Sequence, residues 1–355
     1  MLRGIRIVEI EALGPAPFAG MLLADLGADV IVVHRKQAPV PGRPERSLLD
    51  RGKRSIALDL KDARDVAVLM RLIATADGLI EGFRPGVMER LGLGPDACLA
   101  VNPRLVYGRM TGWGQDGPLA ATAGHDMNYI GLSGALWYAS LPGEPPTLVG
   151  DIGGGALYLV VGMLAGIINA RTRGKGTVVD AAIVDGSAHM MNLLMSLGQS
   201  GALATERGQS LLDGPHWCRV YRTSEGSFIS VQCIEPKFYA LFLDRLGLAA
   251  DPNFARQFDR ELWPELGDRL AAIFAAKPRD EWISLFEGDA CVGPVLGPHE
   301  SALHPHMAAR GTWQAVDGAL QAAAAPRFSS ARWTPPKSPA RGEHDAEIRA
   351  DLAEP

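Results

Sequence analysis

The stretch GIRIVEI at residues 4–10, read with the residues directly after it, decides the fold of this chain. Apolar and polar residues alternate over the stretch, and this period of two is typical of a strand. Pro15 favours a helix over residues 16–26, and Gly27 favours its end. The apolar run Val30–Val33 predicts a second strand, so the three elements together predict a βαβ unit.

The same alternation of strands and helices continues downstream. Apolar residues within 66–73 recur at the spacing of one helical face. Short runs typical of strands follow at Gly78–Ile80, Leu105–Tyr107 and Thr177–Asp180. Strands that alternate with helices predict an α/β fold with a mainly parallel sheet. In such sheets, ligands bind outside the carboxyl ends of the strands.

The turn after the first strand lacks the usual nucleotide-binding fingerprints. Residues 14–20 read GPAPFAG, which does not follow the G-x-G-x-x-G pattern, and two prolines stiffen this turn. No Walker-type sequence occurs either. We therefore do not expect an NAD or FAD site here.

The second half of the chain predicts a smaller α+β domain. A long helix is expected over about residues 181–198, and a strand over Phe228–Cys233. Further helices are expected over residues 236–247, 262–276 and 278–287. Toward its C-terminus the chain becomes rich in Pro, Ala and Arg, which favours an extended surface segment.

Length, charge and cysteine content limit the possible functions. The 355 residues predict about two domains. The formal net charge of −5 argues against a general nucleic-acid binder, which needs a basic surface. The four cysteines are widely spaced and form no CxxC motif, which favours reduced thiols in a cytoplasmic protein. The apolar run at residues 153–170 is long enough for a membrane span, but its glycines favour a buried helix, so no membrane partner is expected.

Two turns with adjacent glycines carry candidate catalytic side chains. His125 follows a glycine, and Asp151 lies in the stretch GDIGGG at residues 150–155. The adjacent glycines let the backbone approach a ligand closely. Because an imidazole and a carboxylate can take up and release protons, we interpret this pair as groups that transfer protons. Glu235 is a third candidate at the end of a strand-like run. Structural alternatives remain open: an ordinary loop for His125, a helix N-cap for Asp151 and a helix start for Glu235.

A series of short motifs occurs in one order along residues 4–300. The motifs are LADLGADV at 23–30, DLK at 59–61, EGFRPGV at 81–87, ERLG at 89–92, MTGWGQ at 110–115, AGHD at 123–126, VGD at 149–151, and GKG at 174–176 leading into VVDA at 178–181. In this order they resemble the family III CoA-transferase superfamily and, within it, the alpha-methylacyl-CoA racemases.

The resemblance implies a role for each candidate side chain. In racemases of this type an imidazole and a carboxylate flank the α-carbon of an acyl-CoA, and His125 and Asp151 match them. Glu235 matches the carboxylate that hydrogen-bonds the histidine. The backbone N–H near Asp126 is expected to stabilise the enolate oxygen. Histidine suits proton transfer because its pKa lies near neutrality, and a carboxyl group suits it when burial raises its pKa.

The CoA part of the substrate requires cations for its phosphates. By resemblance we expect Arg35, Lys61 and Arg90 to bind them, with Arg84 as a weaker choice; solvated surface charge is the alternative for each. The stretch WCRVY at residues 217–221 departs from the family, because racemases of this type tend to carry a Tyr-Asp pair there. Because of this departure, the sequence does not determine the acyl pocket or, therefore, the acyl chain of the substrate.

The resemblance also implies an architecture and an activity. We expect an interlocked homodimer of chains, each with a Rossmann-like large CoA-binding domain over residues 1–200, to which 310–355 returns, and a small domain over 225–309. The expected reaction inverts the 2-methyl centre of a branched acyl-CoA through an enolate. It needs no metal or redox cofactor, since CoA is part of the substrate. Two alternatives stay open: a CoA-transferase in which Asp151 attacks the thioester, and a non-catalytic acyl-CoA-binding relative.

Overall fold

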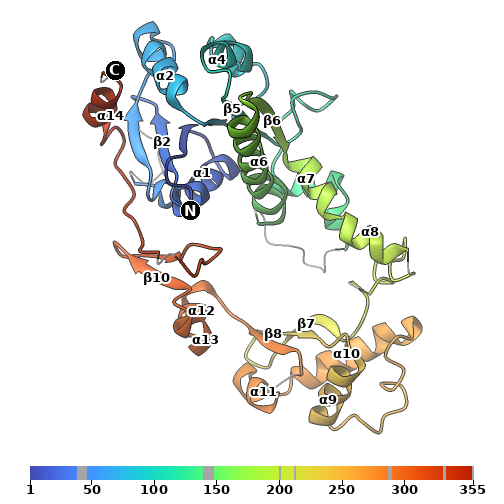
Figure 1. The fold of residues 1–355 in the computed structure, drawn as a ribbon. Coiled ribbons are helices and arrows are strands. Elements are labelled where there is room, and N and C mark those ends of the chain that lie inside the picture. The colour runs from blue at the N-terminus through green and yellow to red at the C-terminus, as the bar shows by residue number, and fades with distance from the viewer. Residues whose placement is uncertain are drawn as a thin grey trace. The chain divides into compact units, whose positions relative to one another are not determined.

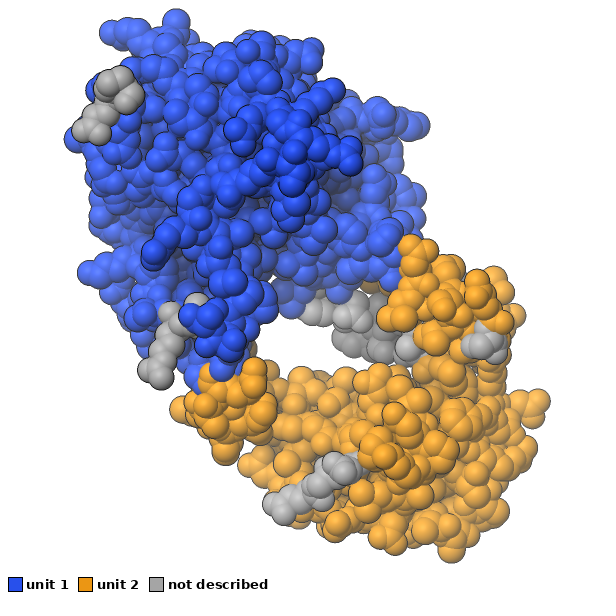
Figure 2. Space-filling model, viewed as in Figure 1, with its two compact units in different colours: residues 1–133, 145–190, 311–355 blue, residues 134–144, 191–310 orange. Residues whose placement is uncertain are grey.

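The computed structural model describes residues 1–37, 46–138, 148–199, 201–211, 213–286, 290–330 and 333–353. The chain divides into two compact units, which Figure 2 shows in different colours. The first unit consists of Met1–Ser133, Pro145–Met190 and Gly311–Pro355, and the second of Gly134–Glu144 and Met191–Arg310.

A six-stranded parallel sheet forms the centre of the first unit (Figure 1). Its strands are β1 (Arg6–Ile10), β2 (Asp29–His34), β3 (Arg54–Ala57), β4 (Gly78–Glu81), β5 (Val106–Thr111) and β6 (Thr177–Ala182). They lie in the order β3-β2-β1-β4-β5-β6, so the direction of winding reverses between β1 and β4. This is the doubly wound Rossmann order, and the expected α/β fold is confirmed. The sequence did not predict β3, because polar residues make up half of it.

Helices cover both faces of this sheet. On one face lie α1 (Pro15–Asp25) and α6 (Leu157–Arg173), and on the other lie α2 (Ala63–Thr75) and α4 (Pro95–Val101). Successive residues of one strand point to opposite faces of the sheet and therefore pack into different hydrophobic cores, as Ile7 and Val8 do. Both residues are completely buried, as expected for a central strand of a parallel sheet.

The apolar run expected as a buried helix corresponds to α6 and the turn before it. On length and composition alone, the stretch Leu148–Arg173 is the one described helix that would be able to cross a membrane, with a mean hydropathy of 1.8. It packs along β5 and β6, however. A Cβ atom at Gly166 would lie 2.7 Å from Val106, so the small residue allows close contact between helix and sheet. This packing is typical of a core helix.

The helix expected over about residues 181–198 is confirmed except at its start, and it is divided at Met191. Strand β6 continues to Ala182, which pairs with Thr111 of β5, so the parallel ladder prevails over the helical preference of the alanines. Two shorter helices follow, α7 (Ile183–Met190) and α8 (Asn192–Gly198).

The second unit combines a small antiparallel sheet with helices. Strands β7 (Cys218–Arg222), β8 (Phe228–Gln232) and β9 (Val292–Val295) form the sheet. Helices α9 (Pro236–Leu246), α10 (Trp263–Phe274) and α11 (Arg279–Leu285) pack on it around an aromatic core. The expected strand and the three expected helices are thus confirmed to within a few residues.

The remaining described elements are short. They are η1 (Leu48–Asp50), α3 (Val87–Arg90), α5 (Asp126–Leu132), η2 (Ala135–Tyr138), the π-helical turn η3 (Leu148–Ala156), η4 (Arg260–Leu262), α12 (Pro298–Leu303), α13 (Pro305–Ala309), β10 (Trp313–Val316), β11 (Ala319–Ala322) and α14 (Asp345–Asp351). The last of these, α14, places Ile348 in the core beside α2, so the chain ends on the first unit.

Candidate active site

A cavity of about 330 Å³ lies at the point where the winding of the sheet reverses. Its walls include residues 13–15 after β1, 82–85 after β4 and 112–113 after β5. The side chains of His125 and Asp151 also line it. The position agrees with the rule that doubly wound sheets bind ligands at this switch point.

His125 directly precedes α5 and is held by a hydrogen bond at the helix start. Its backbone N–H donates to Oδ1 of Asn128, at 3.0 Å. The backbone of His125 is extended, and the residue is exposed to solvent. The imidazole is therefore anchored through the main chain and accessible in the cavity.

Asp151 lies inside the π-helical turn η3, which continues into α6. The N-cap interpretation of Asp151 is wrong, since Ala156 precedes α6 directly. The backbone N–H of Asp151 donates to Oδ1 of the buried Asp126, at 2.7 Å. Burial and, next, the charge of Asp126 raise the pKa of Asp151 to about 6, although His125 opposes the shift. π-Helical segments are frequent at functional sites, and η3 carries a carboxyl group whose pKa is raised to about 6.

The glycines of residues 150–155 permit this close packing. A Cβ atom at Gly150 would lie 2.3 Å from Oδ1 of Asp126, and one at Gly154 would lie 2.3 Å from Oγ of Ser187. Across the cavity, a Cβ atom at Gly14 would lie 3.5 Å from Oδ2 of Asp151. The motif thus brings η3 close to α5 and α7, and Gly14, in front of α1, lies within ordinary contact distance of the Asp151 carboxyl group.

Sequence reasoning missed one feature of this cavity. Tyr129 lines it and packs edge-to-face against Trp113, with ring centroids 4.7 Å apart. Arg84, expected as a weaker phosphate ligand, lines this cavity, and its side chain has no hydrogen bond or ion pair with the described part of the chain. For Tyr129, only its place on α5, one helical turn after His125, would have indicated this position.

A second cavity, of about 360 Å³, lies at the carboxyl ends of β1, β2 and β3. Arg35 and Lys61 both line it, and both are exposed. Arg90, by contrast, belongs to the lining of neither cavity, so its expected role stays a prediction. Phe83 lines both cavities, which therefore adjoin.

Glu235 belongs to the second unit, where it caps α9 just before Pro236. Its carbonyl accepts hydrogen bonds from the N–H groups of Phe238 and Tyr239. The interpretation as a helix start is confirmed. The proposed hydrogen bond to His125 stays a prediction, because the two residues lie in different units.

The strand order defines a doubly wound α/β protein, and the cavity at its switch point contains an imidazole and a carboxyl group, which are groups able to take up and release protons. The chain belongs to CoA-transferase family III, whose family model matches residues 2–345. The family expected from the sequence motifs is confirmed.

Comparison with individual proteins agrees with this assignment. The chain is 41% identical to the alpha-methylacyl-CoA racemase of Mus musculus, over 98% of this chain and 92% of that protein. It is 43% identical to the alpha-methylacyl-CoA racemase of Homo sapiens, over 88% of this chain and 82% of that protein. A crystal structure of a CaiB/BaiF family protein from Brucella suis matches with a TM-score of 0.78 and 28% identity, over 98% of both chains.

Proposed function

We propose that this protein is an acyl-CoA racemase or epimerase that inverts the 2-methyl centre of branched acyl-CoA thioesters. The observation that carries the proposal is the pairing of His125 with Asp151 in one cavity, where the pKa of Asp151 is raised to about 6. The racemases to which the chain is 41% and 43% identical support the choice of substrate class.

The reaction is a proton transfer in two steps. One side chain removes the α-proton of the thioester, and the C–H electrons move into an enolate. The other side chain then protonates the same carbon from the opposite face, which restores the thioester with inverted configuration. We propose His125 and Asp151 for these roles, the N–H of Asp126 for the enolate oxygen and Glu235 for orienting His125.

The CoA part of the substrate is proposed to occupy the cavity at β1, β2 and β3. Arg35 and Lys61 line this cavity as exposed cations, which suits the phosphate groups of the nucleotide. The thioester arm would pass Phe83 into the cavity with His125. We propose no metal or redox cofactor, because the two side chains suffice to take up and release a proton.

The decisive experiment follows the α-proton of a 2-methylacyl-CoA in deuterated water by NMR. The wild-type protein is expected to exchange this proton without any acceptor acid, and His125→Ala is expected to abolish the inversion of either enantiomer. If CoA instead moves between acids and exchange is absent, the protein is a transferase in which Asp151 attacks the thioester and forms a mixed anhydride. Turnover at background level in the wild type would indicate a non-catalytic acyl-CoA-binding protein.

The pH dependence should differ between the two enantiomers. Asp151 must be ionised to remove a proton from one enantiomer and protonated to serve the other. Because its pKa is raised to about 6, kcat/KM should fall below about pH 6 for the first and above about pH 6 for the second. Rates with each pure enantiomer over a range of pH check this. Limbs at the usual carboxyl value of 3.8 would contradict it.

We also propose a homodimer. Leu157, Val161 and Ile168 lie on one face of α6 and are 43%, 64% and 65% exposed, an apolar stripe that a partner subunit would cover. Light scattering should give twice the chain mass of 37.8 kDa, and Val161→Asp should give the monomer mass. The control Ala67→Asp, at an exposed site on α2, should remain dimeric. A monomeric wild type would refute the proposal.

A further inference from the structure

Arg35, one of the cations of the cavity at β1, β2 and β3, is held by its main chain from two sides. Its N–H donates to Oε2 of Glu11 at 2.8 Å, and its carbonyl accepts from Nη1 of Arg341 at 2.7 Å. The guanidinium of Arg35, by contrast, is exposed, and within the described ranges it has no hydrogen-bond or ion-pair partner. The protein thus fixes the backbone of this residue and leaves its charge available.

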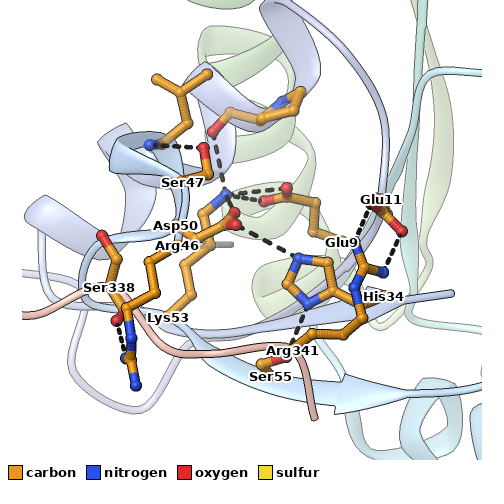
Figure 3. A network of polar contacts seen from close by, with 12 residues as sticks. Glu9, Glu11, His34, Arg46, Ser47, Asp50, Lys53, Ser55, Ser338 and Arg341 are labelled. Atoms are coloured by element: carbon orange, nitrogen blue, oxygen red, sulfur yellow. Dashed lines mark hydrogen bonds and ion pairs between the residues drawn. The ribbon is translucent and has the colours of Figure 1, made fainter. Parts of the chain in front are cut away.

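The two groups that hold Arg35 form an ion pair with each other (Figure 3). Nη1 of Arg341 lies 2.9 Å from Oε2 of Glu11, and Nη2 lies 2.8 Å from Oε1. Burial alone would raise the pKa of Glu11, but the hydrogen bonds from Arg341 and from the Arg35 N–H bring it below its usual value. Glu11 is therefore a stable anion, and the two parallel contacts fix the plane of the Arg341 guanidinium.

The segment that carries Arg341 is itself anchored, on the edge strand β3. The N–H of Gly342 donates to Oγ of Ser55 at 2.8 Å, and the N–H of His344 donates to the Ser55 carbonyl at 3.0 Å. Asp345 accepts the N–H of Ala57 at 2.8 Å. Arg341 therefore reaches Glu11 from a fixed position, although the two residues are far apart in the sequence.

We propose that the Glu11–Arg341 ion pair positions Arg35 to bind the phosphate groups of CoA, so that the C-terminal segment sets the affinity for the nucleotide part of the substrate. Arg341 and Glu11 are then positioning residues, because they act through Arg35. A long side chain loses conformational entropy when it binds a ligand, and a fixed backbone lowers that cost. The inference rests on the proposed binding of an acyl-CoA.

The test compares two ligands that differ only by the nucleotide. Titration calorimetry is carried out with coenzyme A and with pantetheine. Arg341→Met should weaken the binding of coenzyme A about tenfold, equivalent to about 1.4 kcal/mol, and leave pantetheine unaffected. Arg341→Lys keeps the charge but loses the parallel contacts, so it should lie between the wild type and Arg341→Met.

A matched control removes a different contact of the same segment. Arg46 donates to the Ser338 carbonyl at 2.6 Å and to Glu343 at 3.0 Å, and it lines neither cavity. Arg46→Met should therefore leave the affinity for coenzyme A unchanged. An equal loss in Arg46→Met and Arg341→Met would refute the proposal, because general loosening of the segment would then explain both.

A double-mutant cycle tests whether Arg341 acts through Arg35. In an Arg35→Met background, the additional change Arg341→Met should have almost no further effect on the dissociation constant of coenzyme A. Additive losses, or equal losses for coenzyme A and pantetheine, would overturn the inference. Because these are binding measurements, they remain decisive if the racemase assay fails. Conversely, active variants without a nucleotide-specific loss would refute only the positioning role.

Discussion

Asp151→Asn is expected to lower kcat/KM for inversion of the α-carbon about a thousandfold, the largest expected effect on activity. Asparagine has almost the shape of aspartate and retains the backbone N–H that donates to Asp126. It cannot take up or release a proton at neutral pH. The substitution therefore removes one of the two proposed proton-transfer groups while the π-helical turn keeps its packing.

The measurement is the rate at which each pure enantiomer is converted to the other. Asp116→Asn serves as the matched control, because Asp116 is exposed, lies shortly after β5 and does not line the cavity. Its rate should equal that of the wild type. If Asp151→Asn kept more than about a tenth of the wild-type rate, Asp151 would not be a proton-transfer group in this reaction.

Much of the arrangement around Asp151 was accessible from the sequence. Alternation and helix signals predicted the parallel sheet, and adjacent glycines marked the turns of His125 and Asp151. The contact between Asp126 and the Asp151 N–H was not predictable, because it depends on a π-helical turn with no simple residue pattern. For the same reason, the purpose of Gly150 becomes clear only when the position of Asp126 is known.

Other features escaped prediction because long-range packing overrides local patterns. Glu9 is a charged residue in the stretch at residues 4–10, yet it is completely buried. The reason is that β1 is a central strand with helices on both faces of the sheet. Likewise, the Arg341 contact with Glu11 joins parts of the chain that no local pattern connects.

The largest expected effect on stability comes from replacing Lys53, the ion-pair partner of the buried Glu9. Nζ of Lys53 is completely buried and lies 2.7 Å from Oε2 of Glu9 and 3.3 Å from Oδ1 of Asp50 (Figure 3). It also donates to the Pro17 carbonyl at 3.1 Å. Burial raises the pKa of Glu9 to about 7, and Lys53 is the group that opposes this shift most strongly. Lys53→Met would leave two carboxyl groups facing each other in the core without this cation.

Lys53→Met is therefore expected to destabilise the first unit by about 3–5 kcal/mol, the usual cost of removing one partner of a buried ion pair. A group with a raised pKa stabilises the fold while it is protonated, and this stabilisation is lost as the pH rises through its folded-state pKa, about 7 for Glu9 in the wild type. The loss in Lys53→Met should hence be larger at about pH 8 than at about pH 5. Calorimetry should show a Tm about 10 °C lower for the variant.

Two further variants serve as controls for Lys53→Met. Arg64→Met, which breaks an exposed pair with Asp62, should leave Tm unchanged. The double variant Glu9→Met/Lys53→Met should recover much of the loss, because an apolar pair avoids the desolvation of charge. An unchanged Tm in Lys53→Met would mean that the charges of Glu9 and Asp50 are satisfied without Lys53.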